Sequence, residues 1–294
     1  MTSPDAVHDD DGLAGKACFD DIYTQEDPRR YYAALRPLDY QIPQHASQVV
    51  RSLLRRRSGP ETIVDLCCSY GVNAALFAHD LTLEDLFEHY AAELDTADRA
   101  ELIAHDRAFF AAHRRPDAPV TIGLDQSAPA IAYACASGQL DAGFAEDLES
   151  NDPSAALRAA VAGATMITVS GGVGYIGYRT FERVVGAAAR PPWVVALVLR
   201  EVSYEPIIET LDDFGLVTEQ LPYRTFRQRR FADAEEADAA LKRVDALGLS
   251  PAGKEDTGYY HAELFVSRPA DQADQPLEDP VSYTHLTLPT IYSV

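Results

Sequence analysis

Cysteine and tryptophan are scarce in this chain of 294 residues, which holds four Cys, two Met and one Trp. The cysteines at positions 18, 67, 68 and 135 form no CxxC motif and show no Cys/His spacing typical of a zinc site. Cys67 and Cys68 lie next to each other in an apolar run. The pattern therefore predicts reduced thiols, no bound metal and a cytoplasmic protein.

The chain also lacks long apolar runs and has few positive charges. No stretch is long enough to span a bilayer, and no charged-then-apolar leader precedes Asp20, so we expect neither membrane insertion nor export. With 25 Lys and Arg against 46 Asp and Glu, the formal net charge is −21. Such a surface repels the phosphates of nucleic acids and anionic membranes, and we expect neither as a partner.

What the chain does contain is one informative stretch, residues 61–77, which reads ETIVDLCCSYGVNAALF. Residues 62–68 are apolar and β-branched and predict a buried strand. A turn of small residues at 69–71 follows, and apolar residues then recur at helical spacing. A strand, a tight turn and a helix N-terminus form half of a nucleotide-binding crossover, in which free backbone N–H groups can hold a polar ligand group.

The residues of this turn resemble the opening motif of class I S-adenosylmethionine-dependent methyltransferases. Asp65, Cys67, Ser69 and Gly71 occupy the positions of the acidic residue and three glycines of that family. Cys67 and Ser69 replace two of the glycines, and both are small enough for a ligand to come close to the backbone. The resemblance implies that these four positions bind the cofactor. The alternative is an ordinary buried strand and turn.

A second predicted strand, residues 120–125 (VTIGLD), ends in Asp125. A carboxylate at the end of the strand beside the turn can accept hydrogen bonds from both ribose hydroxyls of an adenosine ligand. The resemblance implies this role for Asp125, with Gln126 beside it. The alternative for Asp125 is capping a helix over residues 127–137.

Two more candidate positions follow along the chain. AGFAEDLES predicts a third short strand, and the resemblance implies that Asp147 contacts the adenine amino group while Leu148 contacts the ring. Residues 164–169 predict a fourth strand that runs into SGGVGYIGY, where Ser170 and the glycines mark a tight turn or a close approach. The resemblance places this loop beside the sulfonium.

The order of elements predicts the fold class. A fifth strand in PPWVVALVLREVSY and two further strands at 223–231 and 260–266, around an acidic helix at 234–247, complete an α/β fold with a Rossmann-like, mostly parallel seven-stranded sheet and helices on both faces. We expect residues 1–18 to be disordered, 19–268 to form a single methyltransferase-like domain, and 269–294 to form a disordered tail. Residues 281–294 read as the translation of a sequencing adapter.

Two helical additions are predicted around this sheet. An aromatic N-terminal arm precedes a helix that opens at Pro43, and its candidates for lining an acceptor pocket are Tyr23, Tyr31, Tyr32, Tyr40 and His45. Residues 82–114 predict an inserted helical hairpin, started by a Thr82/Asp85 capping box and then by Thr96. The apolar stripe of this hairpin needs a partner surface, either as a lid over the pocket or in a homodimer. The hairpin histidines, 89, 105 and 113, are expected to be solvated.

The sequence thus predicts an enzyme that transfers a methyl group from S-adenosylmethionine to a small molecule. The sulfonium is already activated, so the protein mainly has to align the acceptor, and no catalytic residue can be identified. Two alternatives remain, an NAD(P)-dependent oxidoreductase and a non-catalytic nucleotide-binding or scaffold protein. The oxidoreductase needs a pyrophosphate close to the turn, where Cys67 and Ser69 leave less room than glycine.

Overall fold

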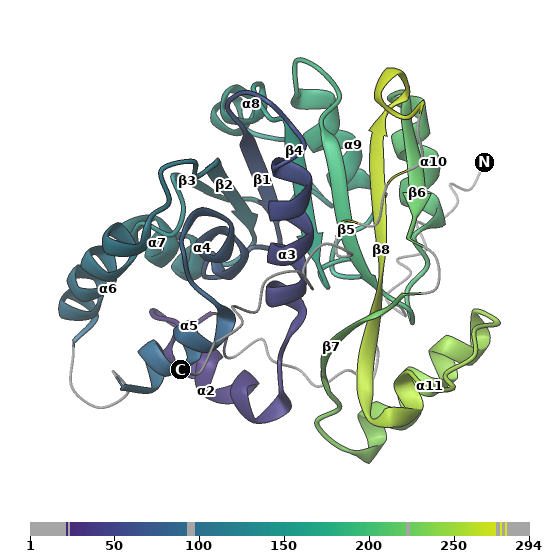
Figure 1. Ribbon diagram of the computed structural model, residues 1–294, viewed down its shortest axis with the longest axis horizontal. Coiled ribbons are helices and arrows are strands. Elements are labelled where there is room, and N and C mark those ends of the chain that lie inside the picture. Colours follow the sequence, from purple (N-terminus) through teal and green to yellow (C-terminus); the bar gives the residue numbers. More distant parts are fainter. Residues whose placement is uncertain are drawn as a thin grey trace, which may run out of the picture.

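An eight-stranded sheet organises the part of the chain that the computed structural model describes, which is residues 22, 24–92, 98–221, 224–274, 277 and 280 (Figure 1). The strands are β1 Thr62–Leu66, β2 Val120–Asp125, β3 Ala142–Ala145, β4 Met166–Ser170, β5 Trp193–Leu199, β6 Leu216–Gln220, β7 Phe226–Arg230 and β8 Tyr259–Pro269. The helices are α2 Arg29–Leu35, α3 Ile42–Leu54, α4 Val72–Ala78, α5 Leu83–Ala92, α6 Arg99–His113, α7 Ala128–Ser137, α8 Ala155–Val161, α9 Tyr178–Ala187, α10 Glu205–Asp213 and α11 Ala234–Ala246. Short 3₁₀ turns are η1 Arg36–Leu38, η2 Glu255–Thr257 and η3 Ala270–Gln272.

The strand order is β3-β2-β1-β4-β5-β8-β6, and β7 pairs with β8 outside this path. Strands β1 to β5 are parallel, whereas β8 is antiparallel to β5, β6 and β7. The winding reverses between β1 and β4, and ligands of open α/β sheets bind outside the carboxyl ends of the strands at such a point. The predicted fold class is confirmed. It is a Rossmann-like α/β fold with a mostly parallel sheet.

The number of strands differs from the predicted seven. The additional strand is β6, which lies at the end of the sheet and pairs with β8, while the predicted strand at 223–231 became β7. Only Leu216 of β6 is fully buried. A five-residue strand with one buried side chain gives little alternation to detect, and this is why the sequence did not reveal it.

Helices cover both faces of the sheet, as β5 illustrates. Val195, Leu197 and Leu199 pack in one cluster with α3, whereas their neighbours in the strand pack in a second cluster with α8, α9 and α10. In Figure 1, α3 lies in front of the sheet, and α8 and α9 lie behind it. Because successive side chains of a strand point to opposite faces, a continuous apolar run is what a strand buried on both faces requires.

A third apolar cluster joins the hairpin to the arm. The stripe of α5 and α6 is buried against α2, α4 and α7, so the chain itself supplies the partner surface that the sequence left open. Thr82 and Asp85 make the predicted capping box, with Thr82 N donating to Asp85 Oδ2 over 2.7 Å. Asp98 caps α6, and the predicted cap Thr96 lies outside the described residues.

Several predicted segments lie at or beyond the limits of the description. Residues 1–18, Tyr23 and 281–294 are outside it. The tail predicted to begin at 269 starts inside β8 and continues into η3, where Trp193 Nε1 donates to Gln272 Oε1 over 2.7 Å. None of the helices in the described ranges has the length and apolar character needed to cross a membrane.

Candidate functional site

The turn that follows β1 has a left-handed backbone at three positions. The φ angle is 53° at Cys67, 49° at Ser69 and 78° at Gly71. A side chain at Gly71 would also be crowded, because a Cβ there would lie 3.3 Å from Ala134 Cβ and from Gln139 Cβ. Cys67 and Ser69 therefore keep a conformation that favours glycine, although each carries a side chain.

Asp125 lies beside this turn, as predicted. Its Oδ2 accepts a hydrogen bond from Ser69 N over 2.8 Å, and its Oδ1 accepts one from Ser127 N over 2.9 Å. Burial raises the pKa of the Asp125 carboxyl, and the hydrogen bonds from backbone N–H groups oppose that rise. Each carboxylate oxygen can still accept from a ligand. The cap of α7 is Ser127, whose side chain accepts from Ala130 N, so capping does not account for Asp125.

Asp65 is fully buried in β1, with one satisfied oxygen and one orphaned oxygen. Oδ1 accepts from Thr168 Oγ1 over 2.8 Å and from Asn73 Nδ2 over 3.1 Å. Oδ2 has no hydrogen-bond partner in the described part of the chain, and neither has the buried Oγ of Ser69. Burial raises the pKa of Asp65 to about 7, despite the two hydrogen bonds that lower it.

The ends of β1 and β4 are linked across the point where the winding reverses. Asn73 Nδ2, at the start of α4, donates to Ser170 Oγ over 2.9 Å. The loop after β4 also lies close to the turn after β1. A Cβ built on Gly172 would lie only 2.8 Å from Cys67 Cβ. The structure thus brings Asp65, Cys67 and Ser170 together. Asn73 was missed, and the signal for it was a lone amide in the apolar helix VNAALFA.

The candidates after β2 and β3 have separate surroundings. Gln126 is exposed, and Asp147 Oδ1 accepts from Glu149 N over 2.9 Å within its own loop. A hydrogen bond from Ser150 lowers the pKa of Asp147. Leu148 is 2% exposed and belongs to the core beneath α8 and α9. The arrangement makes Asp147 accessible, while Leu148 contributes to packing.

Glu149 is a second residue that the sequence did not reveal. Its Oε1 accepts hydrogen bonds from Gly177 N over 2.9 Å, from Thr180 N over 3.1 Å and from Thr180 Oγ1 over 2.5 Å. Glu149 thereby joins the loop after β3 to the start of α9. A carboxylate at a helix N-terminus is also favoured by the helix dipole.

The N-terminal arm and β7 meet at the same edge of the sheet. Tyr70 OH, in the turn, donates to the backbone oxygens of Ile22 and Gln25, each over 2.9 Å. Gln41 N, at the far end of the arm, donates to the backbone oxygen of Gln228 over 2.7 Å. The side chain of Gln228 covers Gly171, where a Cβ would lie 2.6 Å from its Nε2. In Figure 1, α2, α5 and β7 lie near the carboxyl end of β5.

Two aromatic residues of the arm come near the charged groups of this edge. Tyr31 is buried, and its ring centroid lies 5.8 Å from that of Tyr70 and 6.3 Å from that of Tyr40. Burial raises the pKa of Tyr40, the neighbouring charge of Arg229 opposes that rise, and the charge of Asp65 adds to it. Tyr31 thus links Tyr40 to the turn residue Tyr70.

Comparison with known proteins adds limited information. No family model matches the chain, and no curated protein matches it. Similar solved structures include a TehB-like SAM-dependent methyltransferase from Corynebacterium glutamicum ATCC 13032 Kitasato, with 13% identity and a TM-score of 0.39 over 76% of this chain and 88% of that chain. Magnesium protoporphyrin IX methyltransferase from Synechocystis PCC 6803, solved with bound SAM, has 12% identity and a TM-score of 0.38 over 77% and 79%. Precorrin-6y C5,15-methyltransferase from Geobacter metallireducens GS-15 has 9% identity and a TM-score of 0.38 over 76% and 87%.

Proposed function

We propose that this protein transfers a methyl group from S-adenosylmethionine to a small-molecule acceptor. The observation that carries the proposal is the left-handed backbone of Cys67 and Ser69. A residue with a side chain loses about 1–2 kcal/mol in that conformation relative to the right-handed one. A fold that maintains two such residues in one turn, at the carboxyl end of β1, indicates that the shape of the turn serves a ligand.

The residues of the site fit the cofactor on several counts. The buried oxygens Asp65 Oδ2 and Ser69 Oγ have no partner among the described residues, as expected of atoms that serve a ligand. In our proposal Asp125 accepts from the ribose hydroxyls, and the turn from Cys67 to Gly71 holds the methionine part, with Ser170 close by. Asp147 is proposed for the adenine amino group, with Gln126 close by, while the buried Leu148 supports the loop from the core.

When bound, the cofactor supplies a methyl group on a positively charged sulfonium, which needs no further activation. The chain then has to hold the acceptor in line and exclude water. Tyr31 and Tyr40 of the arm are proposed for the acceptor side, because the arm contacts both the turn and β7. A dedicated base is not required, and we assign none.

A second candidate is a protein that binds the cofactor without transferring its methyl group. The observation that favours it is the Cys67 side chain, whose Sγ lies 3.9 Å from the backbone oxygen of Gly172 and occupies space where the family has a glycine. The same side chain leaves less room for a pyrophosphate and disfavours an NAD(P)-dependent oxidoreductase.

Calorimetric titration of the full chain with S-adenosylmethionine, S-adenosylhomocysteine and NADH, each alone, tests the proposal. We expect both sulfur compounds to bind and NADH not to bind. Binding of NADH alone, or of none of the three, would contradict it. If S-adenosylmethionine binds, release of S-adenosylhomocysteine with a set of phenol, amine and carboxylate acceptors separates transfer from binding alone.

A further inference from the structure

A buried carboxylate joins the two helices of the hairpin. Asp106 of α6 is fully buried, and its Oδ2 accepts from Tyr90 OH over 2.6 Å and from Tyr133 OH over 2.7 Å. Its Oδ1 lies 2.8 Å from Nε2 of His89 on α5. The carboxylate is therefore fixed in position by groups from α5 and α7.

The charge of Asp106 has an incomplete counterpart. Among the described residues, its hydrogen-bond partners are two phenols and one imidazole, none of which carries a permanent positive charge. An ionised carboxylate in the protein interior is stabilised by a cationic side chain or by a metal ion. His89 forms an ion pair with this carboxylate only when its imidazole is protonated, and a bound cation would provide a permanent positive charge.

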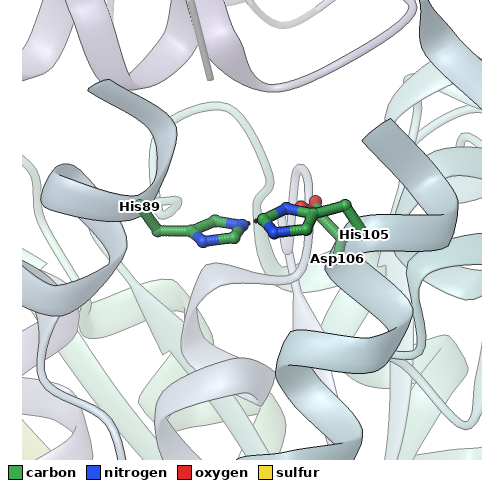
Figure 2. Close-up of side chains that lie close together, drawn as sticks. All are labelled: His89, His105 and Asp106. Carbon is green, nitrogen blue, oxygen red and sulfur yellow. Dashed lines mark hydrogen bonds and ion pairs between the residues drawn. The ribbon is translucent and has the colours of Figure 1, made fainter. Parts of the chain in front are cut away.

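A second imidazole completes a set of donors around Asp106. His105 is exposed, and its ring plane makes an angle of 6° with that of His89, at a centroid distance of 5.2 Å. Figure 2 shows the two imidazoles facing each other from opposite helices, with the Asp106 carboxylate next to them. One nitrogen of each ring and one carboxylate oxygen lie within 4.8 Å of one another.

The surroundings of the cluster suit a bound cation. The His89 ring stacks on Phe109 at 4.0 Å and 17°, which fixes its orientation. His89 also lines a surface cavity of about 340 Å³, whose wall carries the carboxylates of Asp80, Asp85 and Glu88. A negative cavity raises the local concentration of cations and gives them access.

We propose that His89, His105 and Asp106 form a binding site for a divalent transition-metal ion, with Zn²⁺ as the best fit. Two imidazoles and one carboxylate are ligands that Zn²⁺ accepts, with a fourth position open to water. The separation of up to 4.8 Å exceeds what ligands at about 2.0–2.2 Å from one zinc ion allow. Binding therefore requires the three donors to move around the ion, with the His89–Asp106 hydrogen bond replaced by two metal bonds. Tyr90 and Tyr133 then orient the carboxylate from its other oxygen. The metal would join α5 to α6.

Zn²⁺ itself is the probe for this site. The chelator-treated full chain is titrated with ZnCl₂ by calorimetry and with CoCl₂ by absorption spectroscopy, which reports tetrahedral coordination. We expect one equivalent to bind and to raise the melting temperature, because the ion binds the folded chain. His105→Ala should weaken binding by at least about tenfold, as loss of a supporting residue alone already costs that much. Circular dichroism of metal-free His105→Ala should show the native fold, so that weaker binding reports the lost ligand.

The matched control is His113→Ala. His113 also belongs to α6 and lines the cavity, but it lies outside the cluster. This variant should bind Zn²⁺ as the unaltered chain does. Equal affinity in His105→Ala, loss of binding in His113→Ala instead, or a wild-type Kd above about 1 mM would each overturn the proposal.

Discussion

Asp65 and Asp106 are both fully buried, and their surroundings differ. Asp65 lies at the end of β1, where one of its oxygens has no partner in the described ranges and the following turn is left-handed at Cys67 and Ser69. Asp106 lies in the hairpin, where both oxygens have partners and α6 begins at a regular Asp98 cap.

The difference separates a buried carboxylate with an unsatisfied oxygen from one whose oxygens both have protein partners. Unsatisfied buried atoms and backbone strain lower the stability of the free protein, and in our proposal the cofactor satisfies the atoms around Asp65. The hairpin shows neither feature at Asp106, where the hydrogen bonds hold α5, α6 and α7 together. We therefore expect substitutions at Asp106 to affect stability and substitutions around Asp65 to affect binding.

The largest effect is expected from Asp106→Ala. The substitution leaves Tyr90 OH, Tyr133 OH and His89 Nε2 without their acceptor, and a buried unsatisfied donor costs about 1–3 kcal/mol. We expect the free energy of unfolding, measured in urea, to fall by about 5 kcal/mol or the chain to fail to fold. Asp106→Asn keeps an acceptor for the phenols and should lose less. Equal stability of Asp106→Ala and the unaltered chain would contradict a structural role.

Asp65 should make the free energy of unfolding depend on pH in a way that the neutral Asp65→Asn variant does not show. Because the folded-state pKa is raised from 3.8 to about 7, the folded state binds more protons than the unfolded state between these values, and stability falls as pH rises through them. Relative to Asp65→Asn, the unaltered chain should lose up to about 4 kcal/mol between pH 4 and pH 7. Urea unfolding at a series of pH values measures this. Parallel curves for the two proteins would show that Asp65 does not titrate in this range.

A smaller effect should follow from restoring a glycine to the turn. Ser69→Gly relieves the left-handed strain and removes the orphaned hydroxyl, which together outweigh the greater entropy of the unfolded glycine chain. We expect a gain of about 1 kcal/mol in the free energy of unfolding. Ser69→Ala, the control, removes the hydroxyl but keeps the strain. Destabilisation by Ser69→Gly beyond that of Ser69→Ala would show that the turn is not strained.

The sequence predicted the neighbourhood of Asp65 better than its contacts. Strand β2 was predicted at its observed bounds, and Asp65, Ser69 and Asp125 came together because adjacent parallel strands end at one edge of a sheet. The hydrogen bond from Thr168 to Asp65 joins residues 103 positions apart, and it depends on the register of β1 with β4. No local pattern encodes that register.

The hairpin was predicted as two helices with a capping box. Its histidines were expected to be solvated, because their spacing along the chain does not match a metal site. His89 and His105 come together only through the packing of α5 on α6. Asp106 was not singled out at all, because its partners Tyr90 and Tyr133 belong to two other helices. Side-chain networks between helices depend on packing angles, which a hydrophobic stripe does not specify.

The central claim is that the edge around Asp65 and Asp125 holds S-adenosylmethionine, and the affinity of Asp125→Ala for this ligand tests it most directly. Hydrogen bonds to a charged group are worth about 1.5–3 kcal/mol, so the calorimetric Kd of Asp125→Ala should rise by about tenfold or more, while circular dichroism shows the native fold. An unchanged Kd in a folded Asp125→Ala protein would contradict the assignment.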